Sequence, residues 1–421
     1  MELKLSQEVQ DFLKREYPNA DIENMSLDEL KTFKEEVHQK RQELQLLELT
    51  QKRLGNAAYG ASASPFFYFF NVDLAADITG ECRVLTKTMW DKFEVWFHED
   101  IWERKDIWEQ FDFELDLSKK EWFKSQPISV YSDTDSVYVT YGTFFECFTE
   151  ECKKKYDTVR KKVEWILKYN QEFQDKQNNT WCEEMYGPRH GKNVHNFELE
   201  TISRACINLK KKKYLKALSY YKGKFYDDPK IAGTGIEIIK STTPKLCREI
   251  LTELTRSLVF ETTEMDKESY IYYFNDKLAK YKKEFYTAPI EDISMSVGIG
   301  DYEKYVINDE DQLVLGKQCP VSVQAIARYN QLAHINGEDN KRQISGKIKY
   351  YNIRVSQKQG ASSGYFGFPS GDLPDWAPKI ALDIQWQKTI VDPINRFLEV
   401  MNFPLVNAAG VMQLSLFGYD E

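Results

Sequence analysis

The chain has 421 residues, of which 42% are hydrophobic and 14% aromatic, and it carries a net charge of −9. This length predicts two or three domains, and the apolar content excludes an intrinsically disordered chain. There is no apolar run of about 18 residues, and the first residues are charged, so we expect no membrane span, no secretion signal and a cytoplasmic location.

The basic residues are concentrated in one segment of the chain, whereas the cysteines are dispersed. Eight basic residues and no acidic one occur between Arg204 and Lys224, so the negative average hides a strongly basic stretch. Seven dispersed cysteines without a CxxC pair are typical of reduced thiols. Cys147 and Cys152, with His190 and His195 further on, have the residue types of a zinc site, but their loose spacing favours scattered structural residues.

In chain order, the sequence first predicts helices. Ser26 and Glu29 have the spacing of a capping box, and the helical pattern after them runs through Tyr59. A second helical pattern extends to about Glu103, and no element is predicted from there to Lys124.

The rest of the chain mixes strands and helices. Alternating apolar residues predict a strand, a turn and a strand over 128–141. Pro244 suits the start of a helix. The further expected elements are helix over 147–177, strands over 196–207 and 214–226, helix from Thr243, an extended segment at 345–351 and a last helix over 379–401.

Asp133 and Asp135 flank the predicted turn in the sequence Tyr-Ser-Asp-Thr-Asp-Ser. A turn can direct both carboxylates to one point, where they repel unless a cation neutralises them, and hard oxygen ligands suit Mg²⁺. A solvated acidic turn is the alternative interpretation, and the DxD pattern alone does not decide between them.

Lys52, Asn56 and Tyr59 are spaced so that a helix places them on one face. The lysine can neutralise a triphosphate oxygen, and the tyrosine ring can lie against a base or sugar. Gly60 lets another backbone approach closely. For this pattern alone, a helix with an incidental polar stripe is the favoured interpretation.

Together, the two segments resemble the family B DNA polymerases. Residues 52–60, Lys-Arg-Leu-Gly-Asn-Ala-Ala-Tyr-Gly, are similar to motif B, KxxxNSxYG, with Ala57 in place of Ser. Residues 131–136 are similar to motif C, YGDTDS, with Ser132 in place of Gly. The resemblance implies that Lys52, Asn56 and Tyr59 bind the dNTP and that Asp133 and Asp135 are catalytic metal ligands.

The resemblance extends toward the end of the chain. Residues 197–202 are similar to the palm strand beside the metal site, which implies Glu200 as a further ligand of two Mg²⁺ ions. Lys211, Lys212, Lys213 and Tyr214 resemble the KKRY element that holds the primer duplex. Residues 230–244 resemble the palm-to-thumb junction, and residues 369–374 resemble the thumb end of tailed-phage polymerases.

The implied fold is α+β, a partial polymerase right hand. Residues 1–64 would form fingers helices ending in motif B, residues 65–236 an antiparallel palm, and residues 237–421 a largely helical thumb. The tail residues Gln413, Leu414, Leu416 and Phe417 resemble a peptide that docks on a bacterial-type sliding clamp. A hydrophobic tail packed on its own thumb is the alternative.

Motif A, DxxSLYPS, is not found, and neither is a proofreading exonuclease segment. Asp112 and Glu114 have the DxE form of an exonuclease motif, but they lie between motifs B and C, so we expect an acidic surface insertion. The resemblance therefore implies the carboxy-terminal part of a phage polymerase in the host cytoplasm, with primer–template DNA, dNTPs, a sliding clamp and an amino-terminal subunit carrying motif A as partners. A non-catalytic DNA- and clamp-binding remnant, and a broken gene product, are the alternatives.

Overall fold

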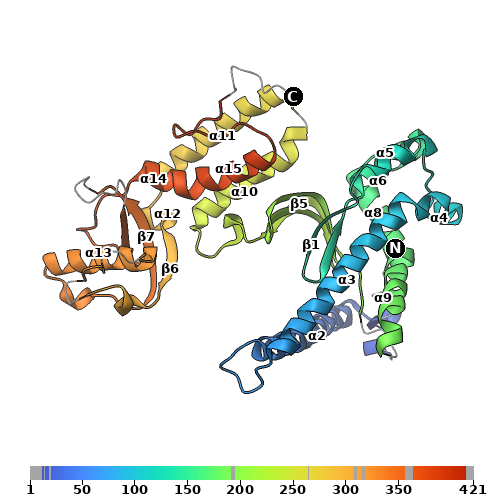
Figure 1. The fold of residues 1–421 in the computed structure, drawn as a ribbon, viewed down its shortest axis with the longest axis horizontal. Coiled ribbons are helices and arrows are strands. Elements are labelled where there is room, and N and C mark those ends of the chain that lie inside the picture. The colour runs from blue at the N-terminus through green and yellow to red at the C-terminus, as the bar shows by residue number, and fades with distance from the viewer. Residues whose placement is uncertain are drawn as a thin grey trace. The chain divides into compact units, whose positions relative to one another are not determined.

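The computed structural model describes most of the chain, namely residues 12–13, 15–18, 20–190, 195–263, 265–307, 311–314, 318–355 and 364–413. Its elements are helices and small antiparallel sheets, which confirms the α+β class. The chain forms two compact units, one of Met1–Trp90 with Thr134–Ser136 and one of Asp91–Asp133 with Val137–Glu421 (Figure 1).

The first unit is built on the long helix α2 (Leu27–Ser62). The Ser26 hydroxyl accepts the Glu29 N–H at 3.4 Å, and the Glu29 carboxylate accepts the Ser26 N–H at 2.7 Å. These bonds satisfy N–H groups that would otherwise lack partners at the helix start, and they confirm the predicted capping box. They also lower the pKa of Glu29. A short 3-10 turn, Ile22–Asn24, precedes the helix.

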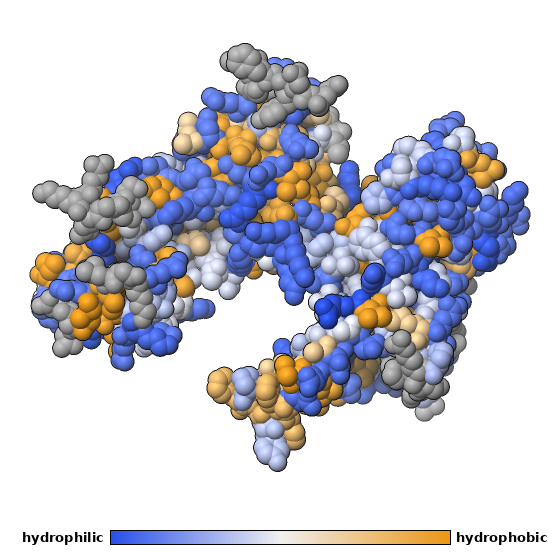
Figure 2. All heavy atoms as spheres, in the orientation of Figure 1, coloured by the Kyte–Doolittle hydropathy of each residue, from blue (hydrophilic) through white to orange (hydrophobic). Residues whose placement is uncertain are grey.

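The loop after α2 leads into α3 (Val72–His98), which continues into the second unit. The Asn71 N–H donates to the Ser62 carbonyl at 2.8 Å and closes the loop. Between these residues the loop carries large exposed aromatic side chains: Phe66 is 97% exposed and Tyr68 94%. Figure 2 shows apolar atoms gathered at this loop. A cluster of this kind on a surface marks a contact site more often than an incidental feature.

The second unit begins with a helical layer around buried aromatic rings. Trp165 stacks on Tyr169 with ring centroids 5.1 Å apart, and Phe113 stacks on Phe148 at 5.2 Å. The helices of this layer are the end of α3, α4 (Lys105–Gln110), α5 (Lys120–Lys124), α6 (Gly142–Glu146), α7 (Glu150–Lys155), α8 (Val159–Tyr169) and α9 (Asp175–His190), with 3-10 turns at Asp100–Glu103 and Leu117–Lys119 and a π-helical turn at Asn170–Gln174.

The sequence pattern predicts the first four strands. Strands β1 (Ser129–Asp133) and β2 (Ser136–Val139) form the expected hairpin. The main antiparallel sheet has the order β3 (Thr201–Lys210), β4 (Lys213–Tyr221), β5 (Lys224–Thr234). Strand β5 is an addition to the prediction, because Asp227, Asp228 and Pro229 interrupt its apolar alternation.

Helices cover one face of this sheet and share its core. Ile207, Leu215 and Ala217 from the sheet belong to the same buried cluster as residues of the following helices. These helices are α10 (Lys245–Phe260), which begins directly after Pro244 as predicted, α11 (Lys267–Thr287), α12 (Ile290–Ile293), α14 (Leu382–Trp386) and α15 (Asp392–Val400), with 3-10 turns at Glu237–Ile239 and Glu261–Thr263. The predicted last helix is present, but a π-helical turn at Gln387–Val391 lies between α14 and α15.

A second, smaller core lies within the same unit. The sheet β6 (Met295–Ile299), β7 (Gly346–Ile353), β8 (Gly364–Pro369) packs against α13 (Val321–Ile335). Short 3-10 turns occur at Tyr302–Lys304 and Asp339–Lys341. Strand β7 was predicted, and α13 lies in the region that was expected to be helical from Thr243, whereas β6 and β8 were not predicted.

The predicted domain boundaries fall inside the compact units. A division after residue 64 would cut the first unit, and a division after residue 236 would separate the main sheet from helices that share its core. Across the part of the chain that the structure describes, no helix combines the length and apolar character that crossing a bilayer requires.

Candidate functional site

Two segments that the sequence analysis singled out meet in the second unit. The main-chain N–H of Lys212 donates a hydrogen bond of 2.9 Å to the hydroxyl of Tyr131, across a separation of 81 residues. Tyr131 lies in β1, two positions before Asp133, and Lys212 lies in the turn between β3 and β4. The contact therefore joins the carboxylate-bearing hairpin to the lysine-rich turn.

The lysine turn is held in a specific backbone conformation. Lys212 has φ of 60°, which is uncommon for a residue with a side chain. On the other side of the turn, Gly235 has φ of 65°, and a Cβ at that position would overlap the carbonyl oxygen of Lys212. The turn is thus fixed by the Tyr131 hydroxyl on one side and by the close approach of a glycine backbone on the other.

Three tyrosines form the contact surface between the hairpin and the sheet. The rings of Tyr131, Tyr138 and Tyr214 lie 5.2, 5.5 and 5.6 Å apart in pairs. Lys216 Nζ lies 5.2 Å from the Tyr138 ring centroid and 5.6 Å from that of Tyr214. Burial raises the pKa of Tyr138 well above its ordinary value, and the neighbouring Tyr214 hydroxyl adds to the shift. Tyr138 therefore stays protonated, and the ring faces of Tyr138 and Tyr214 attract the Lys216 ammonium.

Asp133 is next to the lysine turn. Its Oδ1 lies 3.9 Å from Lys212 Nζ, and the two side chains are 24% and 63% exposed. An ion pair this exposed contributes little stability, so the ammonium is free to exchange its partner. Lys210, Lys211 and Lys212 are exposed and Lys213 is half-buried, so the turn presents a basic surface.

Glu200, the third predicted metal ligand, lies at the other end of β3 from the lysine turn. It precedes the first residue of β3, where Thr201 pairs with Tyr221, whereas the lysine turn follows the Lys210–Lys213 pair at the other end. A strand of ten residues is about 33 Å long. Glu200 lies instead near the Lys222 ammonium, at 3.8 Å. Glu200 and Asp133 are therefore not brought together at one ion. The sequence similarity marked a strand, but it did not indicate which end of the strand faces the hairpin.

The residues that the second unit gathers at Asp133 do not by themselves fit Mg²⁺. They supply one carboxylate and a lysine ammonium, whereas Mg²⁺ takes oxygen ligands in near-octahedral geometry. Among all described residues, no group of three His, Cys, Asp or Glu side chains is arranged to hold a metal ion.

The first unit contains the other predicted site residues. Lys52, Asn56 and Tyr59 lie within α2 at the spacing of one helix face, and all three side chains are exposed. Asp135 is exposed in the hairpin turn, where Thr134 has φ of 54°. The Thr86 hydroxyl of α3 donates to the Thr134 carbonyl at 2.9 Å and fastens the turn.

The tail is described as far as Gln413, which is exposed. Leu414, Leu416 and Phe417 lie outside the described residues. Met412 is 1% exposed, and its main chain makes two hydrogen bonds with the Asn275 amide of α11, at 2.8 and 2.9 Å. The chain is therefore fastened to the helices up to Met412.

The sequence did not predict Tyr131, Tyr138 or Gly235 as members of this site. A signal existed for the tyrosines, because Tyr131 and Tyr138 lie in the two strands that flank the acidic turn. The contact with the lysine turn has no local signal, since it depends on how the hairpin packs on a distant sheet. Comparison with protein-family models finds no match for this chain, and comparison with curated proteins finds none either.

Proposed function

We propose that this chain is the carboxy-terminal part of a family B DNA polymerase and that it completes an active site together with a second polypeptide. The observation that carries the proposal is the contact of the Asp133 hairpin with the lysine turn through Tyr131 and Lys212. Template-directed synthesis needs a metal-binding carboxylate next to a surface that holds the primer backbone. These two features, predicted separately from the sequence, are neighbours.

The proposed role of each residue follows from its chemistry. Lys211, Lys212 and Lys213 hold the primer phosphates, and Tyr214 adds contact near the primer end. Asp133 and Asp135 supply metal-binding oxygens, and Mg²⁺ when bound would neutralise phosphate charge during transfer. Lys52 meets a triphosphate oxygen, while Asn56 and Tyr59 contact the sugar and base. A partner with motif A supplies the missing carboxylate, which accounts for a site that does not fit the metal alone.

The exposed aromatic loop of the first unit also supports a partner. Phe66 and Tyr68 are almost fully exposed, and large apolar side chains of this kind become stable when another surface covers them. A clamp-binding tail at residues 413–417 would tether the assembled enzyme to DNA.

Primer extension tests the proposal. The purified chain, given a primer–template, dNTPs and Mg²⁺, should incorporate no nucleotide. Addition of the motif A polypeptide, sought in the neighbouring reading frame, should start synthesis. In that complex Asp133→Asn should reduce the rate at least about a thousandfold with little loss of DNA affinity, because the metal loses a charged ligand. Lys52→Ala should raise KM for dNTPs and lower kcat, whereas Arg53→Ala, turned away on the same helix, should change both little.

Synthesis by the isolated chain would contradict the proposal. A complex that binds DNA and a clamp but incorporates nothing would show the second candidate, a non-catalytic remnant. The Lys212 ammonium beside Asp133 is the observation that favours this candidate, because it neutralises the carboxylate without a metal.

A further inference from the structure

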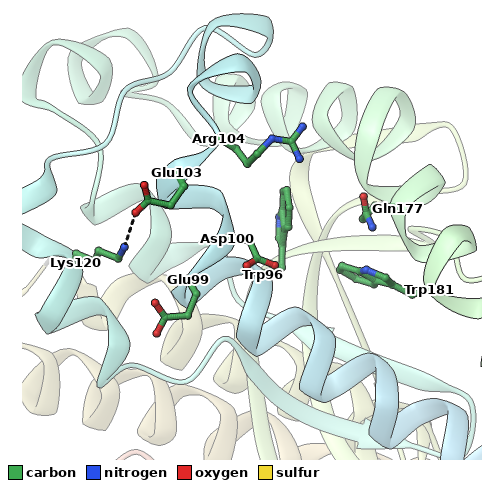
Figure 3. A pocket seen from close by; sticks show the side chains of 8 residues that line it. All are labelled: Trp96, Glu99, Asp100, Glu103, Arg104, Lys120, Gln177 and Trp181. Atoms are coloured by element: carbon green, nitrogen blue, oxygen red, sulfur yellow. Dashed lines mark hydrogen bonds and ion pairs between the residues drawn. The ribbon is translucent and has the colours of Figure 1, made fainter. Parts of the chain in front are cut away.

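A cavity of about 460 Å³ opens in the second unit, at the end of α3, and none of its lining residues belongs to the candidate polymerase site. Trp96 from α3 and Trp181 from α9 form its apolar walls, with Gln177 beside Trp181 (Figure 3). Glu99, Asp100 and Glu103 bring three carboxylates to the same cavity. The first residues of the acidic segment 99–109 therefore line this pocket.

The aromatic walls are fixed before any ligand arrives. Trp96 is 4% exposed, and its indole N–H donates at 2.8 Å to the hydroxyl of Tyr169. That hydroxyl donates in turn to Gln174 at 2.9 Å, and burial keeps it protonated by raising the pKa of Tyr169. Trp181 is 6% exposed and packs edge-to-face on Phe93. A ligand entering the cavity would not need to order these rings, which favours binding.

One carboxylate of the cavity has no ion pair, although the charge of Arg104 acts on it at longer range. Glu103 pairs with Lys120, and Glu99 pairs with Lys124, both at 3.1 Å. Asp100 is exposed and has no ion pair or side-chain hydrogen bond within the described chain.

The remaining cation at the rim is already engaged. Arg104 makes two hydrogen bonds to Asp106, at 2.8 and 2.6 Å, and lies over the Trp96 ring at 5.8 Å. Its place on that ring shows that the wall accommodates a cation. Asp100 thus remains available to a positive group from outside.

Two donors in the cavity also lack acceptors. In the described parts of the chain, neither the Gln177 amide nor the indole N–H of Trp181, a residue that is 6% exposed, makes a hydrogen bond. A ligand that pairs with Asp100 and with both donors therefore carries a cation and hydrogen-bond acceptors together. A free polyamine carries cations and donors only, whereas a peptide carries a basic side chain and main-chain carbonyl oxygens.

We propose that this cavity binds a lysine or arginine side chain of a basic protein segment. The cation lies at Asp100 between the indole walls, and the carbonyl oxygens of the segment accept hydrogen bonds from Gln177 and Trp181. Nucleic acid fits this cavity less well than a basic peptide, because its phosphates would face the Asp100 carboxylate, which has no ion pair. The site goes beyond the proposed polymerase function and does not depend on it, since it lies apart from the Asp133 hairpin and the lysine turn.

The test follows the indole groups directly. The chain is labelled with 5-fluorotryptophan and titrated with an acetylated and amidated peptide of alternating glycine, lysine and arginine, while ¹⁹F NMR follows Trp96 and Trp181. We expect both signals to shift to saturation. Asp100→Asn should weaken the affinity about tenfold or more, since the variant cannot form the charge-assisted bond to the ligand. Gln177→Ala should weaken it several-fold.

Glu109→Gln is the matched control. Glu109 is an exposed carboxylate of the same acidic segment, it has no ion pair in the described chain, and it does not line the cavity. Its replacement should change the affinity less than twofold. An equal loss in both carboxylate variants would mean diffuse attraction and would overturn the proposal. Absence of saturable shifts, or tighter binding of spermidine than of the peptide, would also overturn it.

Discussion

Among single residues, Asp175 offers a test of electrostatics that is independent of function. Its Oδ1 accepts the main-chain N–H of Leu199 at 3.2 Å. Burial raises its pKa to about 6, and the charge of Glu198 adds to the shift, although the Leu199 bond opposes it. The ordinary pKa of this group is 3.8, so the folded chain holds the proton more tightly than the unfolded chain does.

Because its pKa is raised, Asp175 favours the folded state more at low pH than at neutral pH. Between pH 4 and 6 the folded state binds the additional proton, so the stabilisation is fully present below pH 4 and is lost as the pH rises through 6. We expect Asp175→Asn to remove this dependence. Relative to that variant, the wild type should gain about 1 kcal/mol between pH 7 and pH 4.5, a value discounted because the side chain is only half-buried. Urea unfolding of both proteins at the two pH values measures it, and a wild-type gain on raising the pH would contradict it.

At the scale of elements, the lysine turn between β3 and β4 should hold duplex DNA through its phosphates. Replacing Lys211, Lys212 and Lys213 together by alanine should weaken binding of all sequences alike. The slope of log affinity against log salt concentration should fall by about 0.9 for each DNA phosphate that the variant no longer neutralises. Fluorescence anisotropy with a labelled primer–template at several salt concentrations measures both quantities.

The opposite turn of the same sheet supplies the control. Lys222 and Lys224 lie at the Glu200 end, where Lys222 already has a carboxylate neighbour at 3.8 Å. Their replacement should leave the salt slope nearly unchanged. An unchanged slope in the triple variant would show instead that the lysine turn is a solvated surface that does not contact DNA phosphates.

We expect that the tail can be deleted after Met412 without loss of the contacts between Met412 and α11. Deletion of residues 413–421 leaves Met412 and its bonds to Asn275 in place, so the melting temperature should change by less than about 2 °C. The same deletion should abolish binding to a sliding clamp, because buried Leu and Phe anchors contribute about 2 kcal/mol or more each. Surface plasmon resonance on immobilised clamp measures the change in affinity.

A longer deletion separates the two roles of the tail. Removal from residue 405 onward also takes away buried Val406 and Met412, and it should lower the melting temperature by several degrees. If the shorter deletion had that thermal effect and kept clamp affinity, the tail would be a packed element of the helices.

At the scale of the whole molecule, the shared core sets where the chain can be divided. A chain ending at residue 236 would expose Ile207, Leu215 and Ala217, which α10, α11 and α15 bury. Burial of larger side chains such as these stabilises by about 2 kcal/mol each, so this fragment should lack a cooperative thermal transition. A chain of residues 91–421 keeps all described cores of the second unit and should retain the transition. Near-UV circular dichroism during heating distinguishes the two fragments.

Local patterns predicted local structure. The Ser26 capping box, the β1–β2 hairpin and the start of α10 after Pro244 each depend on a few neighbouring residues, and the structure has all three. Strands β5, β6 and β8 were missed, because charged, proline or glycine residues interrupt their alternation and only pairing with neighbouring strands stabilises them.

The candidate site was predictable only in parts. Asp133 and Lys212 were identified from their own segments, but their proximity requires the packing of Tyr131 on the sheet. The position of Glu200 was equally unpredictable, since it precedes β3 at the end opposite to the lysine turn. The sequence shows the type of each residue directly, whereas the proximity of distant residues depends on long-range packing.

One buried amide, that of Gln385, helps to join the smaller core to the helices. Gln385 donates to the Ile293 carbonyl at 2.7 Å, and its oxygen accepts from the Asn352 main chain and side chain at 3.0 and 2.6 Å. Ile293 ends α12, where the chain leaves the helices, and Gln385 lies in α14, where it returns. Hydrogen bonds are directional, unlike apolar contacts, so tilting this lobe would strain three bonds at once. Gln385 thus restricts the orientation of the smaller core relative to α12 and α14.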